Sequence, residues 1–171
     1  MISDDDFWTF SLAVYRQPGV SEECLALQER LGADVNLVLL CAYLGAKRHA
    51  LLDEGDIDSA VAVSTAWHAD VVRNLRAARQ ALKPWEEGRD LSLQDSSRVL
   101  RSAVKKLELD AERIEHDLLA NWASRRNFKS SSPDAAVPAN IRTLVEYYES
   151  ADDASSPPKL LIAAALSLAS D

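Results

Sequence analysis

The stretch Gly32-Ala-Asp-Val-Asn-Leu-Val-Leu-Leu-Cys-Ala-Tyr-Leu-Gly45 decides the fold class of this chain. Beyond Asp34 and Asn36 it is apolar over three helical turns, and a helix that is apolar on all faces is normally the buried centre of a bundle. Asp34 suits the N-cap, where its carboxylate accepts hydrogen bonds from free backbone amides of the next turn. We therefore expect a central helix from Val35 to about Leu52, closed by Gly55.

Composition agrees with an all-α fold, namely a compact bundle of five to six helices. The 171 residues are 47% hydrophobic and include only five glycines, whereas a sheet protein is richer in β-branched residues and turn glycines. Cys24 and Cys41 have apolar neighbours and no CxxC spacing, so we expect buried thiols in a reducing compartment. The acidic N-terminus does not resemble a secretory signal, and the longest apolar run is shorter than a membrane span. These features predict a cytoplasmic protein that does not insert into membranes.

Two long helices, at about 57–83 and 94–124, are expected to form an antiparallel hairpin, with Pro84 and Gly88 breaking the chain between them. The second helix carries apolar residues at heptad spacing, which predicts a buried seam about three repeats long. The seam residues are Leu100, Val104, Leu107, Ala111, Ile114 and Leu118.

Other elements are shorter. Ser3 and Ser21 are predicted to cap two N-terminal helices, which end near Tyr15 and at Gly32. The predicted domain organisation is a helical bundle over 1–128, followed by linker segments over 129–171. The linkers carry a short helix at 139–149 and an apolar tail helix at 159–170.

The first forty residues resemble a known family. The pattern Phe7-Trp8-x-Phe10-Ser11-Leu12, Tyr15, Pro18-Gly19-Val20, Cys24-Leu25-x-Leu27-Gln28 and Gly32-x-Asp34-Val35-Asn36-Leu37 is similar to a proteobacterial domain of unknown function. The resemblance covers residues 7–45 specifically and extends to about residue 120. It implies a small cytoplasmic bacterial helical protein, and it supplies no activity, cofactor or catalytic residue.

Four residues near the N-terminus are candidates for a small-ligand pocket. Trp8 and Tyr15 belong to an aromatic group, and Asp34 with Asn36 could orient a ligand beside it. The structural alternative is that the aromatic rings pack in the core and that Asp34 only caps its helix. Both interpretations stay open at the level of sequence.

Basic residues on the hairpin are a second candidate site. Residues 73–129 carry thirteen Lys and Arg against nine Asp and Glu, a net charge of +4, which leaves −12 for the rest of the chain and −8 overall. The overall negative charge argues against nucleic-acid binding. A docking surface for an acidic partner or a phosphate group is one interpretation, and a solvated face is the other. The candidate residues are Arg73, Arg76, Arg79, Arg98 and Arg101.

The sequence contains no motif for a catalytic residue, a metal or a cofactor. A di-iron bundle needs two Glu-x-x-His motifs, and neither these nor HExxH, Gly-x-Ser-x-Gly or a glycine-rich phosphate loop is present. Glu112 and His116 are four residues apart, but the heptad seam predicts that both face water.

Three hypotheses about function follow. The leading one is a non-catalytic protein-interaction or adaptor module, with a protein partner or self-association through the tail helix. The alternative is a small-ligand binding or sensing domain that uses Trp8, Tyr15, Asp34 and Asn36. The third is an enzyme built on the bundle with His49 or His116 and carboxylates.

Overall fold

The computed structural model describes residues 4–149 and 157–169, and its described elements are helices apart from one pair of two-residue strands. The all-α fold class is confirmed. The chain runs through α1 (Asp4–Tyr15), α2 (Val20–Leu31), α3 (Val35–Arg48), β1 (Ala50–Leu51), α4 (Glu54–Trp67), the π-helical turn η1 (His68–Val72), α5 (Arg73–Glu86), α6 (Gln94–Ser124), β2 (Lys129–Ser130), α7 (Pro133–Tyr148) and α8 (Lys159–Ser167). β1 pairs antiparallel with β2.

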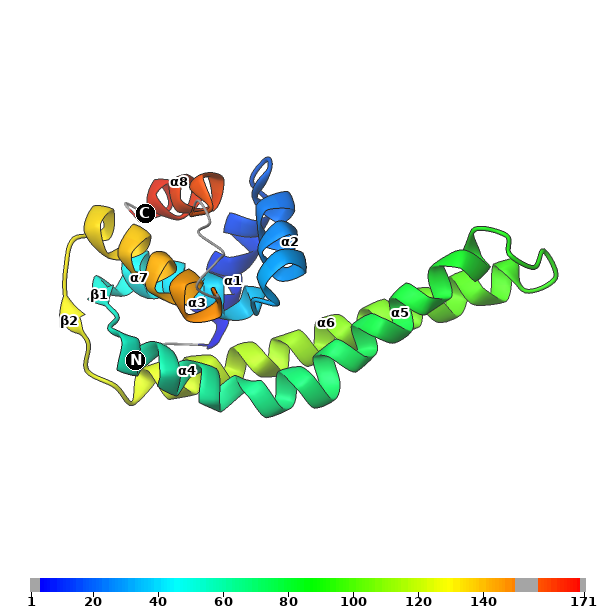
Figure 1. Ribbon diagram of the computed structural model, residues 1–171, viewed down its shortest axis with the longest axis horizontal. Coiled ribbons are helices and arrows are strands. Elements are labelled where there is room, and N and C mark those ends of the chain that lie inside the picture. Colours follow the sequence, from blue (N-terminus) through cyan, green and yellow to red (C-terminus); the bar gives the residue numbers. More distant parts are fainter. Residues whose placement is uncertain (1–3, 150–156, 170–171) are drawn as a thin grey trace.

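Helix α3 is the centre of a globular body formed with α1, α2, α7 and α8 (Figure 1). Every residue of α3 from Asn36 to Ala46 is buried, which confirms the expectation for an apolar helix. Gly45 allows α7 to approach closely, since a methyl group there would lie 2.8 Å from the backbone nitrogen of Val137. The central helix is therefore enclosed on all sides.

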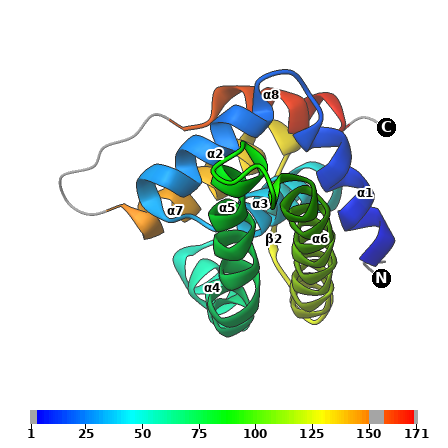
Figure 2. The same ribbon diagram turned by 90° about the vertical axis from the view of Figure 1, so that its right-hand side faces the viewer.

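The predicted helical hairpin is confirmed, and it projects from the body as a long arm (Figure 1). Figure 2 looks along the arm and shows α5 and α6 side by side. Pro84 does not break the first helix, because it lies within the last turn of α5, which continues to Glu86. The turn follows at Gly88, whose φ of 98° lies in the left-handed region.

The predicted heptad seam of α6 is wrong as a buried surface. Leu100 and Leu107 are 52% and 54% exposed, and Ile114 and Leu118 are also exposed. Ala111 is the seam residue that is buried. The side of α6 that faces the rest of the protein carries instead Glu108, Ala111, Glu115, His116, Leu119, Ala120, Trp122 and Ala123. Polar contacts, rather than leucine packing, therefore join much of α6 to its neighbours.

Several helix ends differ from the sequence prediction. α2 begins at Val20, so Ser21 lies inside the helix and donates its hydroxyl to Glu22 instead of capping. α3 stops at Arg48, because His49 adopts a left-handed conformation that ends the helix. Gly55 belongs to α4, which Asp53 caps through a reciprocal pair of hydrogen bonds with Asp56. Ser3 lies outside the described residues.

Helix α7 begins earlier than predicted, at Pro133, so part of the stretch with linker composition is helical. Pro133 occupies the first turn, where the missing amide hydrogen costs no helical hydrogen bond. Asn140 on α7 is fully buried and connects three backbone groups. Its Oδ1 accepts from Leu52 N, and its Nδ2 donates to the carbonyls of Cys41 and Ala50.

Helix α8 packs against the body. Leu161 and Ala165 are fully buried and belong to the main hydrophobic core. The carboxylate of Glu23 on α2 accepts hydrogen bonds from the backbone amides of Leu160 and Leu161 at the start of α8. The body therefore includes the last described helix.

Cys24 and Cys41 are free and buried, as the sequence predicted. Within the described ranges, no helix combines the length and the apolar composition that crossing a membrane requires.

Candidate functional site

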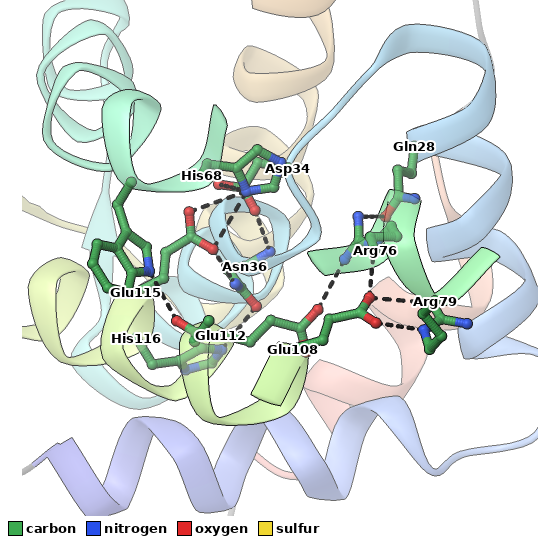
Figure 3. Close-up of polar contacts among 12 residues, drawn as sticks. Gln28, Asp34, Asn36, His68, Arg76, Arg79, Glu108, Glu112, Glu115 and His116 are labelled. Carbon is green, nitrogen blue, oxygen red and sulfur yellow. Dashed lines mark hydrogen bonds and ion pairs between the residues drawn. The ribbon is translucent and has the colours of Figure 1, made fainter. Parts of the chain in front are cut away.

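A cluster of buried polar side chains lies where α6 crosses the start of α3 and η1 (Figure 3). This buried cluster consists of Asp34, Asn36, His68, Glu115 and His116. Glu115 is 0% exposed, His116 2% and Asp34 4%. These side chains are shielded from water, so their charges and hydrogen-bonding groups must be compensated by contacts with one another.

Asn36 connects the two acidic members of the buried cluster. Its backbone amide donates to Asp34 Oδ1 at 2.9 Å, which is the N-cap contact expected from the sequence. Its Nδ2 donates to Glu115 Oε2 at 2.5 Å. Asn36 Oδ1 then faces His116 Nε2 at 3.0 Å, and because an amide oxygen only accepts, Nε2 must carry the proton.

His68 approaches both carboxylates. It is the first residue of η1, a π-helical turn of the kind that is often found at functional sites. Its Nδ1 lies 3.1 Å from Glu115 Oε1 and 3.4 Å from Asp34 Oδ2. Asp34 Oδ2 has no hydrogen-bond partner among the described residues. Asp34, His68 and Glu115 are also residue types that ligate metals, and their potential ligand atoms lie within 4.8 Å of one another.

Burial and mutual charge shift the pKa values in this cluster. Burial, with the nearby charge of Glu115, raises the pKa of Asp34 to about 7. Burial lowers the pKa of His68, but its contacts with Glu115 and Asp34 outweigh that effect and raise it. Burial and Arg113 lower the pKa of His116 to about 3. His116 is therefore neutral at pH 7, with its proton on Nε2 and a free lone pair on Nδ1.

A second polar group, the hairpin ion network, joins α5 to α6 beside the buried cluster (Figure 3). Arg76 donates to Glu108 at 3.0 Å, to Glu112 at 2.8 Å and to Gln28 of α2 at 2.6 Å. Arg79 also donates to Glu108 through two nitrogens. Burial raises the pKa of Glu112. The network therefore joins the two helices of the arm to each other, and it joins the arm to α2 in the body.

A cavity of about 470 Å³ opens beside both groups, between the body and the base of the arm. Helix α1 contributes Trp8, Ser11, Leu12 and Tyr15, and α2 contributes Leu25, Gln28 and Glu29. Asp34, Val35, Asn36 and Leu39 line it from α3 and its cap, and the arm contributes Arg76, Arg79, Gln80, Lys105, Glu108, Leu109, Glu112 and His116. A larger hollow of about 680 Å³ lies between α2 and the start of α8, away from the buried cluster.

Ser11 and His116, which line the cavity, each hold a buried polar atom without a partner, in addition to Asp34 Oδ2 described above. Within the described part of the chain, neither Ser11 Oγ nor His116 Nδ1 makes a hydrogen bond. The His116 ring is stacked on Phe7 at 4.2 Å between centroids, and Trp8 approaches it edge-on at 4.9 Å. Buried polar groups in proteins are usually satisfied, so these two atoms would gain hydrogen bonds if a shift of the neighbouring side chains admitted a water or a ligand atom.

Six of the nine candidate residues from the sequence line this one cavity: Trp8, Tyr15, Asp34, Asn36, Arg76 and Arg79. Arg73, Arg98 and Arg101 do not line it. Arg101 pairs with Glu86 across the arm, and Arg98 pairs with Asp95 on its exposed surface. The five candidate arginines therefore do not all lie in one place. Whether any of the nine binds a ligand stays a prediction.

Glu115, Glu108 and His68 were not predicted at a site from the sequence, and the expectation that His116 faces water is wrong. Glu108, Glu115 and His116 lie on the side of α6 that the leucine heptad excluded from the core. Glu108, Ala111 and Glu115 follow the same heptad spacing in a shifted register, which is the sequence signal that could have identified this side.

Comparison with known proteins identifies a family for this chain. A family model described as "Protein of unknown function (DUF2390)" matches residues 6–119. No curated protein and no solved structure matches the sequence. The matched range includes the buried cluster, the hairpin ion network and every residue that lines the cavity.

Proposed function

The chain belongs to this family of proteins of unknown function, and we propose that it binds a small uncharged molecule in the cavity between the body and the arm. The observation that carries the proposal is a cavity of about 470 Å³ with unpartnered buried polar atoms on its lining residues. This volume falls within the range of about 300–1,000 Å³ that is usual for ligand sites.

The lining supports a ligand with an apolar body. Trp8, Leu12 and Leu39 provide apolar surface from α1 and α3. The arginines of the inner wall already pair with carboxylates of α6, so they offer little net charge to an anion. An uncharged ligand would leave these ion pairs intact, whereas an anion would compete with Glu108 and Glu112 for the arginines.

The hydrogen-bonding groups define the polar part of the ligand. His116 is neutral and holds its proton on Nε2, so Nδ1 can only accept a hydrogen bond. Ser11 Oγ can either donate or accept. A ligand with a hydroxyl or amide donor therefore complements these two residues.

Ligand binding can be tested by thermal shift with a panel of uncharged metabolites carrying hydroxyl or amide groups and a second panel of carboxylates and phosphates. A bound compound at 100-fold over its Kd should stabilise the protein by about 2.7 kcal/mol. Leu25→Trp adds bulk at a half-exposed residue that lines the cavity and should remove the effect. Leu91→Trp, at an exposed position in the turn of the arm, should preserve it. The proposal fails if no uncharged compound stabilises the protein, or if Leu25→Trp responds like the wild type.

The exposed leucines of the arm favour a second candidate function, association through a helical interface. Leu100, Leu107 and Ile114 repeat at seven residues and face away from the protein, while ion pairs join α6 to α5. A seven-residue repeat is the spacing with which one helix packs along another. A second copy of this chain offers the same row of residues, so a symmetric contact between two arms is the first association to test.

Self-association can be measured by sedimentation equilibrium. The wild type should form a dimer, and the double substitution Leu100→Lys with Leu107→Lys should yield a monomer of unchanged helix content, because both side chains are already exposed. Ser102→Lys is the matched control, since helical periodicity places it near the far side of α6 from this row. A wild type that stays monomeric at high concentration would contradict self-association.

A further inference from the structure

Three potential metal ligands come together from separate parts of the fold. Asp34 caps α3, His68 begins η1, and Glu115 lies in the middle of α6 (Figure 3). Their potential ligand atoms all lie within 4.8 Å of one another. The carboxylates are almost fully buried, and the side chain of His68 is 15% exposed. The three residues are therefore far apart in the sequence and meet in the interior of the fold, unlike a run of acidic residues on the surface.

The charge balance at this point favours a cation. Two carboxylates face one imidazole, and Asp34 Oδ2 has no hydrogen-bond partner among the described residues although Asp34 is only 4% exposed. A buried carboxylate oxygen normally accepts hydrogen bonds or binds a metal. Here Oδ2 faces His68 Nδ1 at 3.4 Å.

The separations from His68 Nδ1 to the two carboxylate oxygens match those of ligands around one metal ion. Zinc binds nitrogen and carboxylate oxygen at about 2.0–2.2 Å, so two neighbouring ligand atoms stand about 3.0–3.5 Å apart. His68 Nδ1 lies 3.1 Å from Glu115 Oε1 and 3.4 Å from Asp34 Oδ2. Around one ion the two carboxylates would also be neighbours, and their potential ligand atoms lie within 4.8 Å of each other here.

Asn36 positions both carboxylates. Its backbone amide holds Asp34 Oδ1, and its Nδ2 holds Glu115 Oε2. The other oxygen of each carboxylate is thereby left toward His68. Hydrogen bonds that orient ligands in this way are a regular feature of metal sites in proteins.

We propose that Asp34, His68 and Glu115 bind one divalent transition-metal ion. One imidazole nitrogen with two carboxylate oxygens suits Zn²⁺ or Mn²⁺ better than a soft ion, since soft ions prefer thiolate sulfur. Three protein ligands leave at least one coordination position for water or another small ligand. Asp34 also lines the cavity, so the metal would lie at its inner edge. The metal site does not depend on the ligand proposed above.

The test uses the full chain without a histidine tag, stripped by a chelator and then dialysed against Zn²⁺ or Mn²⁺. Metal content by mass spectrometry should approach one ion per chain, and calorimetry should give its affinity. Asp34→Asn, His68→Gln and Glu115→Gln should each weaken binding by about 100-fold or more. Retained circular dichroism shows that these near-isosteric variants are folded.

Two controls separate this site from adventitious binding. His49→Asn removes an exposed histidine, and asparagine tolerates the left-handed conformation found there. Glu112→Gln removes a carboxylate just outside the donor set. Both variants should bind metal like the wild type. The proposal is overturned if the wild type binds less than a stoichiometric amount of both ions, or if the three ligand variants keep its affinity. Leu25→Trp should bind metal normally, which distinguishes failure of this site from failure of the cavity.

Discussion

Asp34→Asn is expected to raise the free energy of unfolding of the metal-free protein by up to about 4 kcal/mol at pH 8, and by less than about 1 kcal/mol at pH 4. Burial and the charge of Glu115 raise the pKa of Asp34 from 3.8 to about 7. Ionising this carboxyl therefore costs more free energy in the folded state than in the unfolded state, and this lowers the stability of the wild type. Asparagine keeps the cap, because its Oδ1 can still accept from the backbone amide of Asn36.

The direction of the pH dependence follows from the raised pKa. Well below pH 3.8 the carboxyl is neutral in both states and has no such cost. As the pH rises toward 7, the unfolded state loses its proton first, so the wild type loses stability relative to Asp34→Asn. Above pH 7 the difference becomes constant. Urea denaturation of both proteins in chelator, between pH 4 and pH 8, measures this curve.

Asp53→Asn is the matched control for this prediction. Asp53 is also an N-cap residue, on α4, but it is exposed. The same substitution there should change stability by less than about 0.5 kcal/mol, without growth toward high pH. If Asp34→Asn destabilises the protein at every pH, the carboxylate is stabilising in the folded state and the site is not strained by its charge.

The central helix and its cap could be predicted from the sequence because both depend on local information. A helix that is apolar on every face is predicted to be buried from its sequence alone. The cap is equally local, because Asp34 accepts its hydrogen bond from the backbone amide two residues later. The end of the same helix could not be predicted in this way. Arg48 is followed by His49 in a left-handed conformation, which the strand pair after it and the contacts of Asn140 help to hold.

The arm shows why a clear pattern led to the wrong side of α6. Leucines at heptad spacing predict a seam when a partner helix is there to receive them. Here α5 presents Arg76 and Arg79 to α6, and these pair with Glu108 and Glu112. Ion pairing therefore sets the rotation of α6, and the leucines are left exposed.

The sequence named lining residues in two separate groups, one near the N-terminus and one on the hairpin with Arg76 and Arg79, but not the contacts that join them. Trp8, Tyr15, Asp34 and Asn36 stand close in sequence, so their grouping was visible. Glu115 lies 79 residues from Asn36, and His68 lies 47 residues from Glu115. A single sequence contains no direct signal for contacts over such separations, and acidic residues on a long helix are usually solvated. The three-dimensional fold alone brings these side chains together.

Glu108→Ala is expected to lower the free energy of unfolding by about 3 kcal/mol at pH 7. Glu108 is almost fully buried and accepts hydrogen bonds from Arg76 and Arg79, so its removal leaves two guanidinium groups short of a partner. Glu108→Gln keeps the packing but removes the charge, and should lose about 1–2 kcal/mol. On the same helix, Asp110→Ala breaks an exposed pair with Lys106 and should lose less than about 0.5 kcal/mol.

The pH dependence of the Glu108 variants tests whether the charge itself holds the arm in place. Burial raises the pKa of Glu108, but the hydrogen bonds and charges of Arg79 and Arg76 outweigh burial and bring it below its ordinary value of 4.5. The folded state therefore favours the ionised form, so this stability is present above pH 4.5 and is lost as the pH falls below it. The difference between wild type and Glu108→Gln should shrink in that acid range. If Glu108→Gln is as stable as the wild type at every pH, packing by the side chain, and not its ion pairs, fixes the rotation of α6.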